Sequence, residues 1–199
     1  MLRAVVIALL LPGFAVAQDR APPPPGPDAP AEVLSTAQLA AQDMLQMYEE
    51  FCLQRFPGEA AIQEGVAAHH LSVAGAAETS AALLGRAGHA WRAVTPNGTF
   101  FIAIEAAPHA GCAVSGPAGD DAGIHAAFEL AVRSYAQAHE FGMLTAPPLQ
   151  NGKVAGQDAS VQIFGATPDG RPRQAFVNMQ SVAKDGVAQL RLTRELAPK

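Results

Sequence analysis

The first 17 residues determine in which compartment the rest of the chain has to fold. Met1-Leu-Arg supplies a positive charge, residues 4–14 form an apolar run, and Ala15-Val16-Ala17 offers a small-residue cleavage site before Gln18. This is the layout of a secretory signal peptide. The apolar run is well short of the roughly 20 residues that a membrane-spanning helix needs. We therefore expect residues 1–17 to be removed and the mature chain to be periplasmic or secreted, with no membrane insertion after cleavage.

Export gives a definite meaning to the two cysteines, Cys52 and Cys112. In an oxidising compartment a lone pair of cysteines usually forms a structural disulfide. The alternatives are a redox-active pair or a metal site, and redox pairs usually have a close spacing such as C-x-x-C, which this chain lacks. A disulfide predicts that the helix carrying Cys52 lies against the strand carrying Cys112.

Composition limits the organisation and the partners of the mature chain. Residues 18–33 are rich in proline and have no hydrophobic pattern, which predicts a disordered spacer before a single domain over residues 34–199. The chain has 13 Lys+Arg against 18 Asp+Glu, a formal net charge of −5 at pH 7. An acidic protein has no electrostatic attraction to nucleic acid, so we expect as partner an unknown envelope protein or a small molecule.

The domain begins with a helix whose start is clearly marked. Ser35 is a good N-cap, and Gln38 three positions later completes a capping box. Apolar residues then recur at helical spacing past Cys52 until Pro57-Gly58 ends the run. Two shorter helices are expected near residues 59–71 and 79–84.

A strand pattern follows, with a turn that sets its register. Asn97-Gly98 lies between the apolar runs 89–95 and 99–105, which predicts a type I′ hairpin. A third strand, near residues 110–115, carries Cys112. A two-residue turn at Asn97-Gly98 pairs Thr95 with Phe100, Ala93 with Ile102, and Trp91 with Ile104.

The second half repeats the order of a helix and three strands. A helix is expected from Asp120 to about Phe141, then a loop over residues 142–158 and three strands near residues 160–166, 173–183 and 187–194. A turn at Asp185-Gly186 pairs Ala183 with Ala188, Ser181 with Leu190, and Met179 with Leu192. The prediction is an α+β fold, with an antiparallel sheet of about five to six strands and helices packed mainly on one face. Its coarse topology resembles profilin-like and PAS-like sensor folds.

Polar side chains alternate along the last hairpin and offer a candidate binding face. The face opposite the apolar one carries Asn178, Gln180, Gln189, Arg191 and Thr193. With Arg92 and Arg191 as charged anchors, the candidate set is Arg92, Asn178, Gln180, Gln189 and Arg191. A sheet face that is simply solvated explains the same residues.

No motif for catalysis or for a cofactor is present in the sequence. We find no G-x-S-x-G elbow, no Walker loop, no dinucleotide-binding glycines and no H-E-x-x-H. His125 and Glu129 are one helical turn apart and could contribute to a metal site, although such a pair is common by chance. Ser115, at a strand end before a glycine-rich turn, is the candidate nucleophile of a serine hydrolase. We assign no catalytic residue, no metal ligand and no cofactor.

Several short motifs resemble a family of small exported proteobacterial proteins of unknown function. They are Phe51-Cys52, Phe56-Pro57, the stretch from Gly88 to Trp91, and the stretch from Cys112 to Val114, so they span about a third of the chain. The resemblance implies an exported, disulfide-bonded domain and brings no catalytic residues with it.

The leading hypothesis is an exported, soluble accessory or binding protein of the bacterial cell envelope that does not catalyse a reaction. One alternative is a small-molecule sensor module with a pocket between sheet and helix. The other is a metal-assisted or serine hydrolase that uses His125, Glu129 or Ser115.

Overall fold

A computed structural model describes the chain from Leu34 onward, over residues 34–106, 110–117, 121–138, 141–143, 150–154, 157–168, 175–184 and 186–196. The chain divides into two units, Met1–Val33 and Leu34–Lys199, and the structure described below is that of the second. The predicted signal peptide and the proline-rich spacer lie outside the described residues.

Helix α1, Thr36–Met47, begins as the capping box predicts. The Gln38 amide donates to Ser35 Oγ at 3.2 Å, and the Ser35 amide donates to Gln38 Oε1 at 2.8 Å. These two bonds satisfy amides that no helical carbonyl can reach, which confirms the predicted N-terminus.

The same helix continues without a break as the π-helical segment η1, Tyr48–Arg55, whose turns contain more residues than those of an α-helix. The Phe56 amide bonds back over five residues to the Phe51 carbonyl at 3.0 Å, which is the π-helical pattern. As a result three successive side chains, those of Phe51, Cys52 and Leu53, are all buried. An α-helical stripe would turn at least one of them toward solvent.

The strands form one antiparallel sheet, which has nine strands in the described part of the chain. Their order is β1-β2-β3-β4-β9-β8-β7-β5, with β6 also pairing with β7. The strands are β1 Ser72–Val73, β2 Gly88–Thr95, β3 Gly98–Glu105, β4 Ala110–Pro117, β5 Phe141–Met143, β6 Gln150–Val154, β7 Gln157–Pro168, β8 Ala175–Lys184 and β9 Val187–Leu196. The remaining helices are α2 Glu59–Ala68, α3 Ala76–Ala82 and α4 Asp121–Ala138.

The predicted α+β class is confirmed, whereas the predicted number of strands is too low. All six predicted strands are present, and β1, β5 and β6 are additional. The expectation of a loop over residues 142–158 is therefore wrong, because β6 and part of β5 and β7 lie within it. The three additional strands are short, and β5 and β6 are held in place by pairing with the long strand β7. Their own sequences are too short to show an alternation of apolar and polar residues that would predict a strand.

The first hairpin has a different turn from the predicted one. Thr95 pairs with Gly98, Ala93 with Phe100 and Trp91 with Ile102, so the loop residues are Pro96 and Asn97. A type I′ turn needs a positive φ at both loop residues, and the proline ring fixes φ near −65°. The shift is by two residues, so Trp91, Ala93, Phe100 and Ile102 still share the buried face.

Helix α1 holds this turn through one carboxylate. Asp43 Oδ2 accepts hydrogen bonds from Thr95 Oγ1 at 2.6 Å and from Asn97 Nδ2 at 2.9 Å. The side chains of a proline-containing turn are thus bonded to the helix that crosses the sheet.

The last hairpin has the predicted register. Ala183 pairs with Ala188, Ser181 with Leu190 and Met179 with Leu192. Gly186, in the turn, has a φ of 75°, a conformation that glycine adopts without steric cost.

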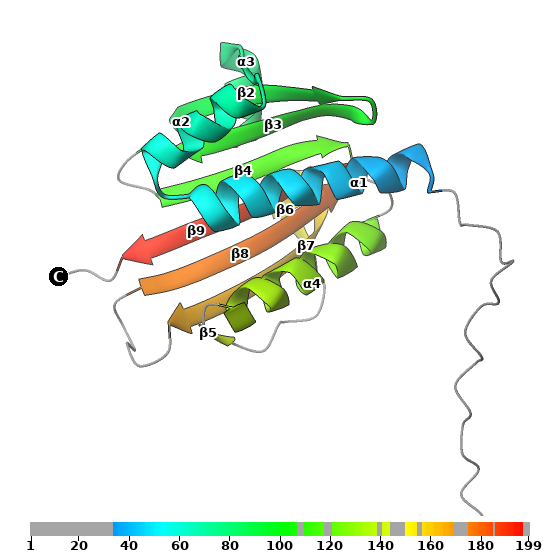
Figure 1. Cartoon of the computed structure of the whole chain (residues 1–199). Coiled ribbons are helices and arrows are strands. Elements are labelled where there is room, and N and C mark those ends of the chain that lie inside the picture. The colour runs from blue at the N-terminus through cyan, green and yellow to red at the C-terminus, as the bar shows by residue number, and fades with distance from the viewer. Residues whose placement is uncertain are drawn as a thin grey trace, which may run out of the picture. The chain divides into compact units, whose positions relative to one another are not determined.

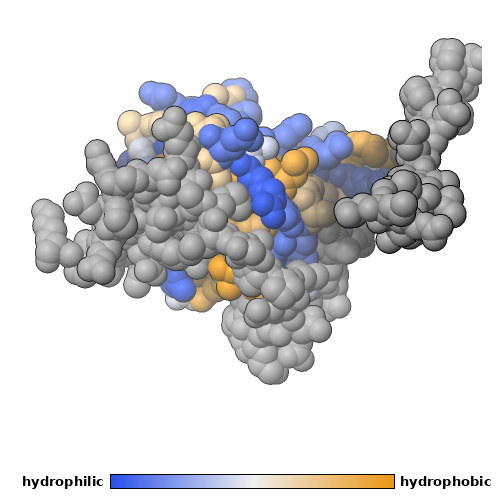
Figure 2. All heavy atoms as spheres, turned by 90° about the horizontal axis from the view of Figure 1, so that it is seen from below, coloured by the Kyte–Doolittle hydropathy of each residue, from blue (hydrophilic) through white to orange (hydrophobic). Residues whose placement is uncertain are grey.

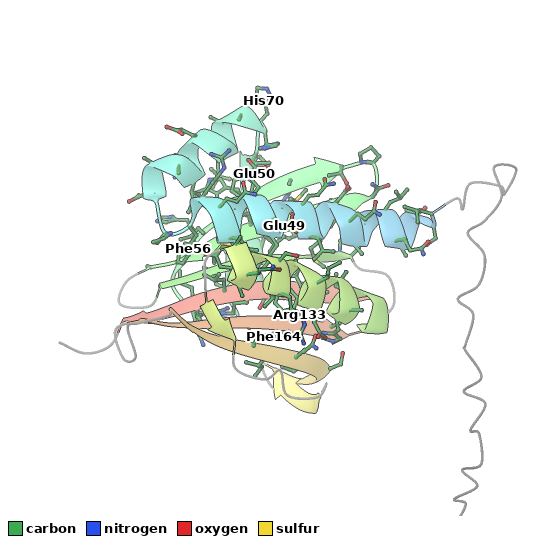
Figure 3. All side chains as sticks on the ribbon, turned by 60° about the horizontal axis from the view of Figure 1, so that its bottom comes forward. Glu49, Glu50, Phe56, His70, Arg133 and Phe164 are labelled. Carbon is green, nitrogen blue, oxygen red and sulfur yellow. A yellow bond between two sulfur atoms is a disulfide. The ribbon has the colours of Figure 1, made fainter. Side chains whose placement is uncertain are left out.

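Helices cover the two faces of the sheet unequally (Figure 1). Helices α1 and α4 lie side by side on one face, while α3 packs on the other face against β2, β3 and β4. The larger core lies under α1, η1 and α4, where the rings of Tyr48 and Phe128 have centroids 5.5 Å apart. Phe164 of β7 continues this aromatic row, 6.0 Å from Phe128 (Figure 3). None of the described helices is both long and apolar enough to cross a membrane.

The predicted disulfide is confirmed. Cys52 of η1 and Cys112 of β4 are bonded, with their Cα atoms 5.4 Å apart and a sequence separation of 60. Both residues are buried in the larger core. The bond therefore ties the first helix to the middle of the sheet.

Helices α2 and α3 end in the same way, with a residue in the left-handed conformation. The Leu71 amide bonds to the Val66 carbonyl at 3.0 Å and the His70 amide to the Ala67 carbonyl at 3.2 Å, which forms a Schellman motif. His70 has a φ of 51° and Leu84, at the end of α3, a φ of 53°. Glycine is the residue that usually occupies this position.

Removal of the disulfide should lower stability substantially. In the chain-entropy account a loop of this length contributes roughly 4 kcal/mol, because the cross-link restricts the unfolded chain. We expect the Cys52→Ala/Cys112→Ala variant to lose about this much in urea-induced unfolding, and a reductant to destabilise the unmodified protein similarly. A reductant that leaves the unfolding midpoint of the unmodified protein unchanged would contradict this prediction.

Replacement of His70 by glycine should stabilise the protein. The exposed His70 side chain projects at the end of α2 (Figure 3), and its left-handed backbone costs a residue with a Cβ about 1 kcal/mol. We expect His70→Gly to raise the free energy of unfolding by up to this amount. His70→Ala, which keeps the Cβ, is the matched control and should give no such gain in the same urea titration.

Candidate functional site

The polar side chains of β9 are not on an open face. Gln189 and Arg191 are only 9% and 6% exposed, because α3 lies over this part of the sheet. Gln189 Nε2 donates to the carbonyl of Ala82, in the last turn of α3, at 2.8 Å. The prediction that these two residues belong to an accessible polar face is therefore wrong.

Arg191 takes part in a buried ion cluster on this face. Its guanidinium forms an ion pair with the carboxylate of Glu105 on β3. Arg86, in the turn between α3 and β2, donates from Nη1 to the two oxygens of the same carboxylate at 3.1 and 3.3 Å. The side chains of Glu105 and Arg191 are 2% and 7% exposed, and that of Arg86 is 51% exposed. We call these three residues the Glu105 cluster.

Strand register and one glycine make room for the cluster. Ile104 pairs with Cys112, which pairs with Leu192, so Glu105 and Gly111 are next to each other on neighbouring strands. A Cβ at Gly111 would lie 2.5 Å from Glu105 Oε2. The absence of a side chain there lets the Glu105 carboxylate lie flat on the sheet, where Arg191 can reach it.

The cluster has an excess of positive charge. Burial, and then repulsion from Arg86, lower the pKa of Arg191 to about 10, so the guanidinium is still protonated at neutral pH. Two guanidinium groups therefore share one carboxylate. Nη1 of Arg191 is buried and has no hydrogen-bond partner within the described part of the chain.

Arg92, the other predicted anchor, has a structural partner. It forms an ion pair with Glu78 of α3, and the second oxygen of Glu78 accepts from the Gly75 amide at 2.8 Å. The bond from Gly75, followed by that from Arg92, holds the pKa of Glu78 below its usual value. Arg92 thus fastens the start of α3 to β2.

Asn178 and Gln180 complete the predicted face. Asn178 pairs with Thr193 and Gln180 with Arg191 across the β8–β9 ladder. Their side chains lie outside the part that the structure describes. The five predicted residues consequently do not form one described surface, since Gln189 and Arg191 are buried and Arg92 bonds to α3.

On the opposite face of the sheet, His125 of α4 is buried between two serines. His125 Nδ1 lies 2.6 Å from Ser181 Oγ and Nε2 lies 3.0 Å from Ser160 Oγ. Ser160 donates its own proton to the Ala183 carbonyl at 3.0 Å, so its oxygen accepts from Nε2–H. In the neutral ring Nδ1 then accepts from the Ser181 hydroxyl, and the three groups link α4 to β7 and β8.

This contact lacks two features of a hydrolytic site. Ser181 is fully buried, so no substrate carbonyl can approach its hydroxyl in this arrangement. A catalytic histidine is also oriented by a third group, usually a carboxylate, on its second nitrogen, whereas here that nitrogen bonds to Ser160. We interpret the contact as structural.

The structure does not bring Ser115 and His125 together. Ser115 pairs with Phe101 and Gln189, both of which belong to the face under α3. His125 bonds to Ser181 on the other face. The sheet separates the hydroxyl of Ser115 from the imidazole that the hydrolase hypothesis needs.

Glu129, the proposed companion of His125, bonds elsewhere. Its Oε1 accepts from Arg133 Nη2 at 2.6 Å and its Oε2 accepts from Gln162 Nε2 at 3.1 Å. No group of three or more His, Cys, Asp or Glu side chains that could hold a metal ion occurs among the described residues. His109 and His139 lie outside them.

Sequence reasoning missed the Glu105 cluster. Glu105 was not among the candidate residues, although it lies on the same face of the sheet as Arg92. One signal was available: Ala90, Ala103 and Ala113 lie opposite one another on three neighbouring strands, and small residues on a sheet face leave room for an element packed closely on it. No local pattern connects Arg86, Glu105 and Arg191.

Comparisons with known proteins add no relative: no family model, no curated protein and no solved structure matches the chain.

Loss of the Glu105 charge should destabilise the fold strongly. Glu105→Gln leaves the buried Arg191 guanidinium without its counter-charge, and removal of one partner of a buried ion pair costs about 3–5 kcal/mol. We expect a loss of this order in urea-induced unfolding. Glu49→Gln, an exposed carboxylate of η1, is the control and should behave as an ordinary surface substitution. Equal unfolding curves for the two variants would show that the cluster contributes nothing.

Proposed function

We propose that this protein is an exported accessory protein of the bacterial cell envelope that acts by binding and not by catalysis. The observation that carries the proposal is the buried Cys52–Cys112 disulfide, because such bonds form and persist in oxidising compartments. The signal-like N-terminus agrees with this location. Membership of a family of small exported proteobacterial proteins is part of the proposal.

The described side chains support binding over catalysis. The Ser–His contact is buried and has a second serine, Ser160, on the other ring nitrogen, and the buried acid Glu105 is neutralised by two arginines. A catalytic acid or base needs access to a substrate, and neither group has it.

The described part of the surface has no single broad hydrophobic patch. The large apolar side chains exposed in the described part lie on different elements: Val73, Leu84, Val94, Leu130, Ile163 and Val187. Among the coloured residues in Figure 2, hydrophobic and hydrophilic ones are interspersed. Single exposed apolar side chains are normal, so polar recognition fits this surface better than a large apolar contact.

Native mass spectrometry of the protein recovered from its compartment tests the proposal. The expected species is a chain that begins at Gln18, has lost two hydrogens through disulfide formation, and carries a non-covalent ligand or partner that it does not alter. A full-length chain with free thiols would contradict export, and steady conversion of a bound molecule would contradict the absence of catalysis.

The hydrolase alternative has its own test, since His125 does contact a serine hydroxyl. We expect no labelling of the folded protein by a serine-directed fluorophosphonate, because Ser181 is buried. Labelling of Ser181 or Ser160 that disappears in His125→Gln, with the fold of that variant verified by circular dichroism, would revive the alternative. Labelling that appears only after unfolding agrees with the structural interpretation.

A further inference from the structure

The Glu105 cluster has both a charge and a hydrogen-bonding capacity that the described chain does not satisfy. Arg86 and Arg191 carry two positive charges against the single charge of Glu105. Arg191 Nη1 is buried and unpartnered, although its side chain is 93% removed from solvent. A buried donor without a partner costs about 1–3 kcal/mol, and an uncompensated charge costs more.

We propose that the Glu105 cluster is the binding site for a small oxyanion, namely a carboxylate or phosphate group. Such a group would accept from Arg191 Nη1 and from the free donors of the Arg86 guanidinium, while Glu105 keeps the two arginines in place. The proposal deepens the proposed binding function and rests on it for its biological role.

The chemistry of the two arginines selects this class of ligand. A guanidinium presents several N–H donors in a planar fork that matches the oxygens of carboxylate and phosphate. A water molecule could satisfy Nη1 but would leave the excess positive charge. Chloride could supply the charge but not the pair of oxygens.

Access to the cluster is from the turn after α3. The Arg86 side chain is half-exposed, and it follows Leu84 and Gly85, which have φ angles of 53° and 79°. An anion from solvent meets Arg86 first, and because Nη1 of Arg191 is buried, it reaches this second donor only when the half-exposed Arg86 side chain moves aside. The lowering of the Arg191 pKa by burial and by Arg86 should be reversed when a negative charge arrives.

Titration of the purified, oxidised mature protein with sodium phosphate and with sodium acetate, against sodium chloride at equal ionic strength, tests the site. We expect saturable binding of at least one oxyanion by calorimetry, together with a rise in Tm that chloride does not give. The probe that binds more tightly identifies the ligand as phosphoryl or carboxylate.

Two matched variants locate the binding. Arg86→Gln should weaken the binding at least tenfold, whereas Arg133→Gln should not change it. Arg133 is a fair control, because its side chain is 54% exposed and it also pairs with a single glutamate, Glu129. Arg191→Lys, which keeps the charge but loses the fork, should also weaken binding, and ¹⁵N signals of the arginine side chains should shift at Arg191 in the unmodified protein.

Three outcomes would overturn the site: no saturable binding of either oxyanion, an equal loss in Arg86→Gln and Arg133→Gln, or unchanged affinity in Arg86→Gln. The second would mean an adventitious ion only. Because the titration uses purified protein, these outcomes leave the proposed export and partner binding untouched, and failure of export leaves the anion site untouched.

Discussion

The pairing of β4 with β9 is the contact on which the rest of the structure depends. It runs from Ala110 opposite Arg194 to Pro117 opposite Val187. In the described sheet it joins the meander β2-β3-β4, which follows α1, to the meander β7-β8-β9, which follows α4. Each meander is preceded by a long helix, and these two helices, α1 and α4, lie side by side on one face (Figure 1). Without this pairing the described sheet would separate into β1-β2-β3-β4 on one side and β5 to β9 on the other, and each part would cover only a portion of the core.

The first helix is fixed to both central strands, and its π-helical segment makes this possible. Cys52 is bonded to Cys112 on β4, and the hydroxyl of Tyr48 donates to the Arg191 carbonyl on β9 at 3.3 Å. Burial raises the pKa of Tyr48 well above its usual value, so the hydroxyl remains a donor at any physiological pH. Each turn of the π-helical segment contains more residues than an α-helical turn, so several successive side chains face the sheet. The short segment η1 therefore contributes Tyr48, Phe51 and Cys52 to the same core.

A feature of the structure could be predicted from the sequence when the residues that form it are close to one another in the chain. The capping box at Ser35 and the last hairpin were predictable, because the atoms that form them are close in sequence. The first hairpin was misplaced by two residues, since a turn at Asn97-Gly98 would put Pro96 opposite Thr99 in the ladder, although a proline cannot donate there. The prediction of which residues are buried was still correct, because a shift of two residues preserves the alternation.

The exposure of Gln189 and Arg191 was misjudged for a different reason. Alternation shows which side of the sheet a residue faces, but not whether a helix such as α3 covers that side.

The two faces of the sheet are stabilised by different interactions, and this difference explains why the candidate anion site lies on the face under α3. Under α1 and α4 the space is filled by apolar and aromatic side chains such as Phe100 and Phe128, and its polar members His125, Ser160 and Ser181 bond to one another. Under α3 the contact residues are mostly alanines, and the larger side chains Glu105 and Arg191 are charged. Among the described residues, the buried atom left without a hydrogen-bond partner on the first face is an acceptor, Oε1 of Gln162, whereas on the second face the unpartnered atoms are arginine N–H donors. A ligand gains free energy where donors lack partners, so recognition of an anion belongs to the face under α3.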